Sequence, residues 1–184
     1  MVGRKVVREG IIAIKNDKIS YVGKKSKAPK IRAEKIIDGH EKVAMPGLIN
    51  CHTHLAMTLF RGIAEDQPLE KWLKKTIWPL EAKLKPRDVY DGALLGCLEM
   101  IKSGTTTFAD MYFHEDQVAK AVEKAGLRAA LAQGILEAGV SRRGEKMLQN
   151  SVNFARKYEG YADGRVTVQL GPHTVCTCGL NLLV

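Results

Sequence analysis

The chain has 184 residues, of which 45% are hydrophobic and 27% are charged, with a formal net charge of +9. This composition predicts one globular domain with a small appendage, and no apolar run approaches the roughly 18 residues of a membrane span. The basic residues are dispersed, and their densest group (24–30) contains no aromatic side chain, so a solvated surface is favoured over nucleic-acid binding.

The cysteines and the first residues both favour a cytoplasmic protein. Four cysteines are scattered without the spacing of a disulfide framework, and Cys176 and Cys178 do not form a Cys-x-x-Cys pair. Residues 1–10 lack the long apolar segment of a secretion signal. We therefore expect a reducing, cytoplasmic environment.

Residues 1–45 are typical of short strands and turns. Alternating apolar residues predict strands at 10–15 and 18–23, joined as a hairpin by a turn at 16–17. A third strand is predicted at 34–38, before Gly39. A segment of this size cannot form its own core, so we expect it to pack against the rest of the chain.

From residue 46 the pattern changes to strands that alternate with amphipathic helices. The predicted strands are 48–52, 105–110, 127–134 and 165–171, and the predicted helices are 68–78, 86–103, 115–125 and 145–158. By propensity alone, 127–134 could also extend the preceding helix. Alternating strands and helices predict an α/β fold with a parallel sheet and right-handed crossovers.

Prolines and glycines mark the ends of the predicted helices. Pro79 is expected to stop the first helix, Pro86 opens the second, and Gly104 and Gly126 follow the second and third. The predicted apolar stripe of the second helix consists of Tyr90, Leu94, Cys97, Leu98 and Ile101.

Two histidines close the strand predicted at 48–52. Residues two apart on a strand point to the same side, so His52 and His54 are expected to project together. Paired imidazoles are a common way of offering two nitrogen ligands to one metal ion. We favour a metal site here over the alternative of two polar residues at a strand end.

Further polar side chains follow the other predicted strands. Asp110 and His114 follow the second, Gln133 the third and His173 the fourth. Functional groups gather at the carboxyl ends of parallel strands, which predicts that these residues share one rim with the histidine pair. Asp110 and His114 could instead be helix caps, and His173 a loop histidine.

Residues 45–54, Met-Pro-Gly-Leu-Ile-Asn-Cys-His-Thr-His, resemble the first metal-binding strand of the amidohydrolase superfamily. Residues 55–64 and 72–81 narrow the resemblance to the 5-methylthioadenosine/S-adenosylhomocysteine deaminases and the related 5′-deoxyadenosine deaminases. The patterns at 103–107, 109–114 and 171–173 are similar to the same group.

The resemblance implies a (β/α)8 TIM barrel with a small β-sandwich built from the chain ends. Residues 1–45 would then be part of the β-sandwich, and residues 46–184 the first four βα units of the barrel. The implied cofactor is one zinc ion, which activates water for hydrolytic loss of an amino group from a purine nucleoside.

The resemblance also implies roles for individual residues. His52 and His54 would be metal ligands, Glu81 would accept hydrogen bonds from the ribose hydroxyls, and His173 would contact the substrate. Relatives can carry an arginine where this chain has Gln133, and Arg143, or its neighbour Arg142, could replace it.

The remaining ligands of the family, a histidine and an aspartate, and its acid–base glutamate lie on later strands than the four predicted here. No catalytic residue is therefore expected in this chain, and two ligands are too few for a catalytic zinc, which takes about three protein groups and water. We expect the chain alone to be inactive. The alternatives are a different amidohydrolase, of the guanine deaminase, cytosine deaminase or s-triazine chlorohydrolase type, and a non-catalytic half barrel that assembles with a complementing C-terminal half or as a homo-oligomer.

Overall fold

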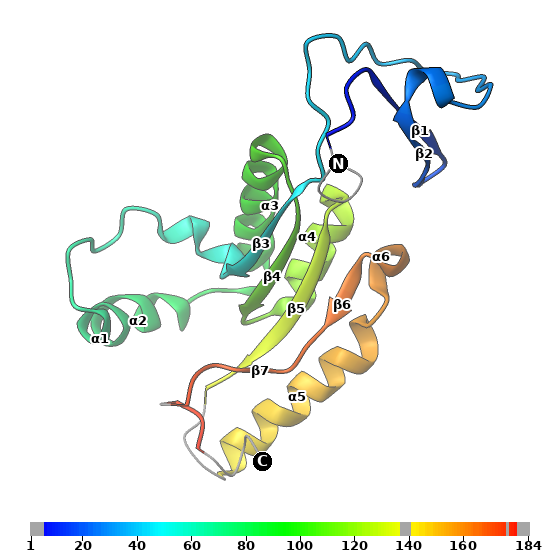
Figure 1. Cartoon of the computed structure of the whole chain (residues 1–184). Helices are drawn as coiled ribbons and strands as arrows, with labels where there is room; N and C mark the ends of the chain where they lie inside the picture. Colours follow the sequence, from blue (N-terminus) through cyan, green and yellow to red (C-terminus); the bar gives the residue numbers. More distant parts are fainter. Residues whose placement is uncertain (1–5, 137–140, 176, 180–184) are drawn as a thin grey trace. The chain divides into compact units, whose positions relative to one another are not determined.

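The computed structural model describes residues 6–136, 141–175 and 177–179. The chain divides into two compact units, Met1–Pro46 and Gly47–Val184, and each is considered by itself. Figure 1 labels their elements. In the described part of the chain, no helix combines the length and apolar character needed to cross a membrane.

The first unit contains the predicted hairpin. Strands β1 (Gly10–Lys15) and β2 (Lys18–Lys24) pair in antiparallel fashion, with a register shift between Ala13 and Ile14. Asn16 takes a positive φ of 58° in the turn, a conformation that asparagine tolerates better than most residues. A short 3-10 helix, η1 (Lys25–Lys27), follows.

The predicted strand at 34–38 is wrong. These residues are irregular and exposed, including Ile36 and Ile37, and the described sheets contain no strand that pairs with them. The reason is that β-branched residues favour a strand only where a neighbour completes the ladder and covers one face.

The second unit is built on a parallel sheet. Strands β3 (Leu48–Thr53), β4 (Thr105–Tyr112), β5 (Arg128–Ile135) and β6 (Val166–Val168) lie in this order, and β7 (Gly171–Pro172) pairs with the end of β5. The strand at 127–134 is therefore confirmed, and the helix alternative is wrong. The strand predicted at 165–171 is interrupted at residues 169–170, although β6 and β7 keep one continuous register against β5.

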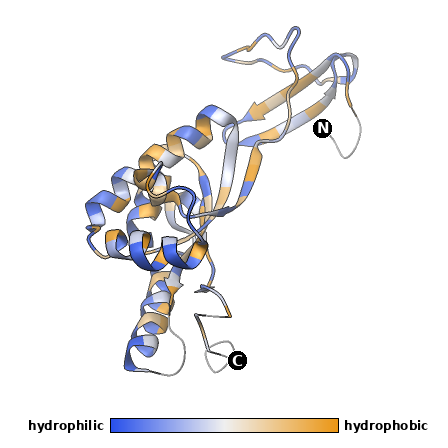
Figure 2. Ribbon diagram, turned by 90° about the vertical axis from the view of Figure 1, so that its left-hand side faces the viewer, coloured by the Kyte–Doolittle hydropathy of each residue, from blue (hydrophilic) through white to orange (hydrophobic). Residues whose placement is uncertain are grey.

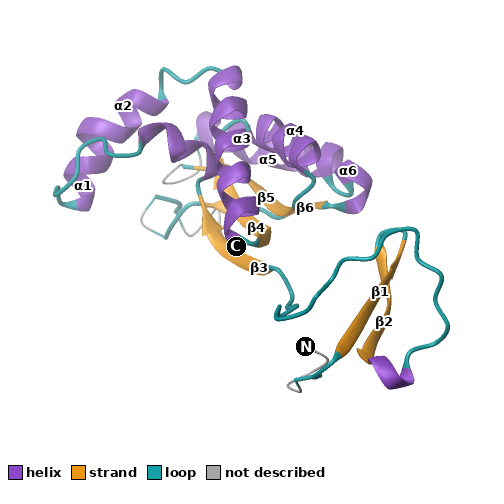
Figure 3. Ribbon diagram, turned by 90° about the horizontal axis from the view of Figure 1, so that it is seen from above, coloured by secondary structure: helices purple, strands orange, loops and turns teal. Residues whose placement is uncertain are grey.

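Helices follow the strands and lie on one side of the sheet (Figure 3). They are α3 (Pro86–Ser103), α4 (Glu115–Ala125), α5 (Arg142–Tyr158) and the short α6 (Tyr161–Gly164). The core lies between these helices and the sheet, with Val89, Phe108, Val118 and Leu131 buried. The helices carry hydrophobic and hydrophilic residues in alternation, as expected for one apolar face each (Figure 2). The α/β fold class is confirmed, since helices alternate with the strands of a parallel sheet.

The glycine-terminated helix ends are also confirmed. Gly104 and Gly126 follow α3 and α4 with φ of 81° and 79°, the left-handed conformation that glycine adopts without strain. The guanidinium of Arg165 donates to the carbonyl oxygens of Val122, at 3.3 Å, and Leu127, at 2.9 Å. The Val122 carbonyl, in the last turn of α4, thus has a second donor besides the N–H of Gly126.

The helix predicted at 68–78 does not stop at Pro79. It comprises α1 (Leu69–Trp72), a π-helical turn η3 (Leu73–Ile77) and α2 (Trp78–Glu81). In the π turn the N–H of Trp78 reaches back five residues to the carbonyl of Leu73. Pro79 then lies in the first turn of α2, where its missing N–H costs little. Glu81 is therefore the last residue of helix α2.

The apolar stripe predicted for α3 is only partly correct. Cys97 is buried, but Leu98 and Ile101 are exposed. The buried face instead includes Gly92 and Gly96, because α3 packs closely against the 3-10 helix η2 (Leu55–Phe60). A Cβ at Gly92 would lie 2.7 Å from the carbonyl oxygen of Ala56, so a side chain does not fit there.

Candidate functional site

The carboxyl end of β3 carries the two predicted metal ligands. His52 belongs to β3, and His54 immediately precedes η2. Their ring centroids are 5.2 Å apart with an interplanar angle of 80°. The structure therefore places the two imidazoles beside each other, with His52 exposed and His54 half-buried.

His54 is oriented by the neighbouring strand. Its Nδ1 lies 2.7 Å from the carbonyl oxygen of Met111 on β4. A carbonyl oxygen only accepts, so Nδ1 carries a hydrogen, and in the neutral ring this leaves the lone pair on Nε2. Backbone carbonyls hold metal-binding histidines in this way, so the residue fits the role of a zinc ligand.

Asp110 holds the backbone on both sides of His54. Its Oδ1 accepts a hydrogen bond from the N–H of Leu55, at 2.8 Å, and another from the hydroxyl of Thr53. The side chain is 1% exposed. Asp110 is therefore not a cap of α4, and it points into the protein interior, where it caps η2.

Glu81 and Tyr112 form a second part of the site. The Tyr112 hydroxyl donates to Oε1 of Glu81 at 2.8 Å, and the Tyr112 ring lies 6.3 Å from that of His54. Burial raises the pKa of the Glu81 carboxyl, while the Tyr112 hydrogen bond and the nearby His54 oppose this shift. Tyr112 was not among the residues predicted from the sequence, although it lies two residues after Asp110 on the same strand and therefore on the same face.

His173 follows β7, and its backbone N–H donates to the carbonyl of Ile135 at 3.1 Å. Its Nδ1 lies 3.0 Å from the hydroxyl oxygen of Thr177. Burial, and to a lesser degree the charge of the nearby His54, lowers the pKa of His173. The structure thus places His173 in the electrostatic neighbourhood of His54, as a ring that favours the neutral form.

The other predicted rim residues have different surroundings. The side chain of Gln133 accepts from the backbone N–H of Glu115 at 3.3 Å, and His114 precedes α4 in a left-handed conformation without a side-chain cap. Arg142 and Arg143 lie exposed in the first turn of α5, after residues 137–140, which are outside the described residues. A role for Arg143 in substrate binding stays a prediction.

Within residues 6–136, 141–175 and 177–179, no three His, Cys, Asp or Glu side chains converge as a metal site would require. His52 and His54 thus offer two imidazoles, and a catalytic zinc takes about three protein ligands.

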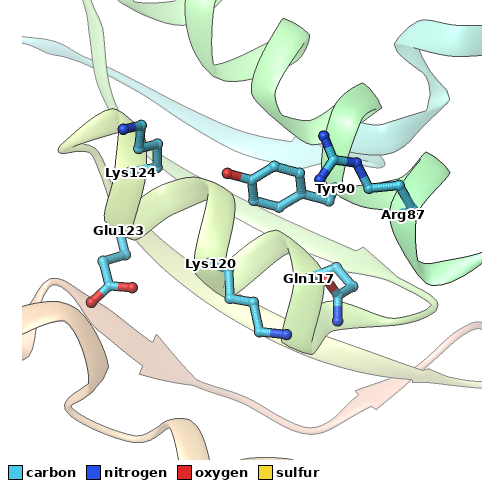
Figure 4. Close-up of a pocket in the computed structure, with 6 residues that line it drawn as sticks. All are labelled: Arg87, Tyr90, Gln117, Lys120, Glu123 and Lys124. Carbon is cyan, nitrogen blue, oxygen red and sulfur yellow. The ribbon is translucent and has the colours of Figure 1, made fainter.

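A separate hollow of about 640 Å³ lies between α3 and α4 (Figure 4). Its lining residues are Arg87, Tyr90, Gln117, Lys120, Glu123 and Lys124. Arg87 pairs with Asp91 at 3.0 Å and Lys120 with Asp116 at 3.8 Å. Because carboxylates offset these charges, the hollow does not resemble a dedicated anion site.

Comparison with known proteins supports the resemblance seen in the sequence. The chain is 52% identical over 174 residues to a 5-methylthioadenosine/S-adenosylhomocysteine deaminase of Pelotomaculum thermopropionicum. The aligned residues make up 94% of this chain and 40% of that protein. It is 50% identical over 177 residues to a 5′-deoxyadenosine deaminase of Methanosarcina acetivorans, covering 96% of this chain and 40% of the relative. The chain therefore spans about two fifths of the length of these relatives.

Solved structures agree on the fold. A zinc-bound adenosine deaminase from Xanthomonas campestris superposes with a TM-score of 0.79 at 27% identity, over 97% of this chain and 41% of its own. A zinc-complexed atrazine chlorohydrolase from Arthrobacter aurescens has a TM-score of 0.77 at 26% identity, over 94% and 44%. The family model of the amidohydrolases matches residues 43–184, and the chain belongs to the amidohydrolase family.

Proposed function

We propose that this chain provides the N-terminal part of a zinc-dependent hydrolase that deaminates adenosine-type nucleosides. The candidate substrates are 5-methylthioadenosine, S-adenosylhomocysteine and 5′-deoxyadenosine, the compounds in the names of the relatives. The observation that carries the proposal is the grouping of two imidazoles at the end of β3 with the Glu81–Tyr112 pair. In the reaction, water replaces the amino group on the purine carbon, and ammonia leaves.

His52 and His54 would hold the metal through two of its positions. The hydrogen bond from Nδ1 of His54 to Met111 supports this role, since it leaves Nε2 available to a cation. When bound, zinc would supply an activated water and polarise the group under attack. The residues that complete the coordination and perform acid–base chemistry would come from a further part of the enzyme.

Glu81 would bind the ribose. One carboxylate oxygen is engaged by Tyr112, which leaves the other to accept hydrogen bonds from a diol. His173 would contact the substrate as a neutral ring, because burial lowers its pKa. Arg143 would bind the 5′ substituent from the start of α5. These assignments predict that the ribose hydroxyls contribute to affinity.

A second candidate is a half barrel that acts only together with another polypeptide. It is favoured by the exposed edge of the sheet, where β3 pairs only with β4 among the described strands and Ile49 is 67% exposed. A long, apolar sheet edge invites pairing with further chain. The covering segment would be a complementing C-terminal half or a second copy.

The decisive experiment compares the 184-residue chain with the same chain joined to a C-terminal half that carries the remaining histidine, glutamate and aspartate of the family. We expect zinc in the joined protein and ammonia release from 5-methylthioadenosine, with neither zinc nor ammonia release for the 184-residue chain. Guanine, cytosine and an s-triazine are the alternative substrates, and preference for one of them would replace the nucleoside assignment. His54→Ala should abolish zinc binding, whereas His40→Ala, an exposed histidine of the first unit, is the matched control.

A further inference from the structure

Two buried carboxyl groups lie behind the histidine pair and are not used by the proposed chemistry. Asp110 lies on β4 and is 1% exposed, and Glu115, the first residue of α4, is fully buried. Oδ2 of Asp110 and both carboxyl oxygens of Glu115 have no conventional donor among the described residues. Buried carboxylates without donors are costly, so this arrangement calls for a compensating interaction.

The compensating interaction is between the two groups themselves. The carboxyl groups of Asp110 and Glu115 are close enough to share a hydrogen bond. Two carboxylates cannot do so unless one of them carries a proton. Oδ1 of Asp110 already accepts hydrogen bonds from the Leu55 N–H and the Thr53 hydroxyl. Such bonds favour the ionised form of the Asp110 carboxyl.

The two donors on Asp110 favour Glu115 as the carrier of the proton. Burial raises the pKa of Glu115 well above its ordinary value, and the charge of Asp110 adds to this shift, while the backbone of Tyr112 opposes it to a smaller degree. Burial also raises the pKa of Asp110, but its hydrogen bonds from Thr53, Leu55 and Glu115 oppose the shift. The pair thus carries one negative charge and one proton, which removes the repulsion of two buried anions.

The pair connects three elements around His54. Glu115 begins α4, Asp110 lies on β4, and Oδ1 of Asp110 holds the residues before and after His54. Met111, the neighbour of Asp110, supplies the carbonyl that fixes Nδ1 of His54. Movement of Asp110 would therefore change both the backbone position and the ring orientation of His54.

We propose that Glu115 is a positioning residue, whose protonated carboxyl donates to Asp110 and thereby holds the Thr53–Leu55 turn so that His54 presents Nε2 to a metal ion. The part of this inference that concerns the metal rests on the proposed function. The proton and the orientation of His54 are properties of the chain itself, and they can be measured without metal or nucleoside.

The first test detects the shared proton by infrared spectroscopy of the full 184-residue chain. We expect the carbonyl stretch of a protonated carboxylic acid, sensitive to exchange in D₂O, which disappears in Glu115→Gln. The amide of glutamine can still donate to Asp110, so this variant should fold. Glu34→Gln, at an exposed position of the first unit, is the matched control and should leave the band unchanged. A spectrum of Glu115→Gln identical to that of the parent would overturn the assignment.

The second test follows the tautomer of His54 by ¹⁵N NMR, with the signal assigned through His54→Gln. In the parent chain and in Glu115→Gln the Nδ1–H form should be favoured about tenfold, since one hydrogen bond to a partly buried carbonyl shifts an equilibrium by about this factor. In Glu115→Met, which keeps the volume but removes the donor, the preference should fall to near parity.

An unchanged tautomer in a folded Glu115→Met chain would show that Glu115 does not position His54. If that variant does not fold, Thr53→Val breaks the same chain of bonds at its other end and must shift the tautomer in the same direction. Neither test uses metal or substrate. A chain that fails as a deaminase component can therefore still show the Glu115–Asp110 arrangement, and a chain that lacks this arrangement can still be a deaminase component.

Discussion

Strands β3 and β4 are neighbours in one sheet, yet they differ in burial and in the number of strands that pair with them. On β4, Phe108 and Tyr112 are buried, and the strand has a partner on both sides. On β3, Leu48 and Ile49 are exposed, and β4 is the only partner among the described strands. The strand that carries the histidine pair is thus the less supported one, and it depends on β4 for its hydrogen bonds and on Asp110 for its turn.

The largest expected effect separates the two strands directly. Phe108→Ala removes a side chain that is 1% exposed and should destabilise the second unit by about 3–5 kcal/mol. Ile49→Ala, on β3, should change the free energy of unfolding by less than about 0.5 kcal/mol. Urea unfolding followed by tryptophan fluorescence measures both, because Trp72 and Trp78 lie in the second unit. Equal losses of stability in the two variants would contradict the stated difference in support between β4 and β3.

A smaller effect is expected where α3 supports the turn after β3. Gly92→Ala would place a Cβ against the carbonyl of Ala56 and should cost about 1–3 kcal/mol. The control is Gly39→Ala, where a Cβ meets no atom within 4 Å. The same unfolding experiment applies, and two equally stable variants would show that the close packing of α3 on η2 is not required.

The Glu81–Tyr112 pair links β4 to α2 and predicts a pH dependence. Because burial raises the pKa of Glu81, the folded state binds its proton more tightly than the unfolded state, and this group's contribution to stability falls as pH rises through the folded pKa. Tyr112→Phe removes a donor to the carboxylate, so it should raise that pKa further and cost about 1 kcal/mol above it. Carboxyl ¹³C titration of Glu81 checks the direction, and a lower pKa in the variant would be inconsistent with the hydrogen bond.

The smallest expected effect distinguishes the two histidines. His54→Ala loses the bond to Met111 and should cost about 1 kcal/mol. His52→Ala, at an exposed position, should stay within about 0.5 kcal/mol of the parent. If both are metal ligands, both variants should nonetheless lose zinc in the joined protein, as measured by metal analysis. If either variant retained zinc, the histidine replaced in that variant would not be a metal ligand.

Local sequence signals predicted the elements whose ends are set by short-range chemistry. The hairpin at 10–24, the helix ended by Gly126 and the parallel strands all appear as predicted, because turns, caps and periodicity depend on neighbouring residues. The strand at 34–38 and the stop at Pro79 were wrong. Both depend on partners outside the local segment: a pairing strand in one case and a π-helical turn in the other.

The candidate site likewise combines features that follow from local sequence with features that depend on tertiary packing. Alternation along a strand was enough to place His52 and His54 together, since it is a property of extended backbone. The sequence by itself thus determined the family, the order of strands and helices, and the pair of imidazoles. Only the tertiary structure decided that Asp110 faces inward to hold the His54 turn, that Tyr112 donates to Glu81, and that Glu115 lies buried against Asp110. These contacts join residues separated by up to 57 positions in the chain, or they depend on which face of an element is buried. Tertiary packing determines both.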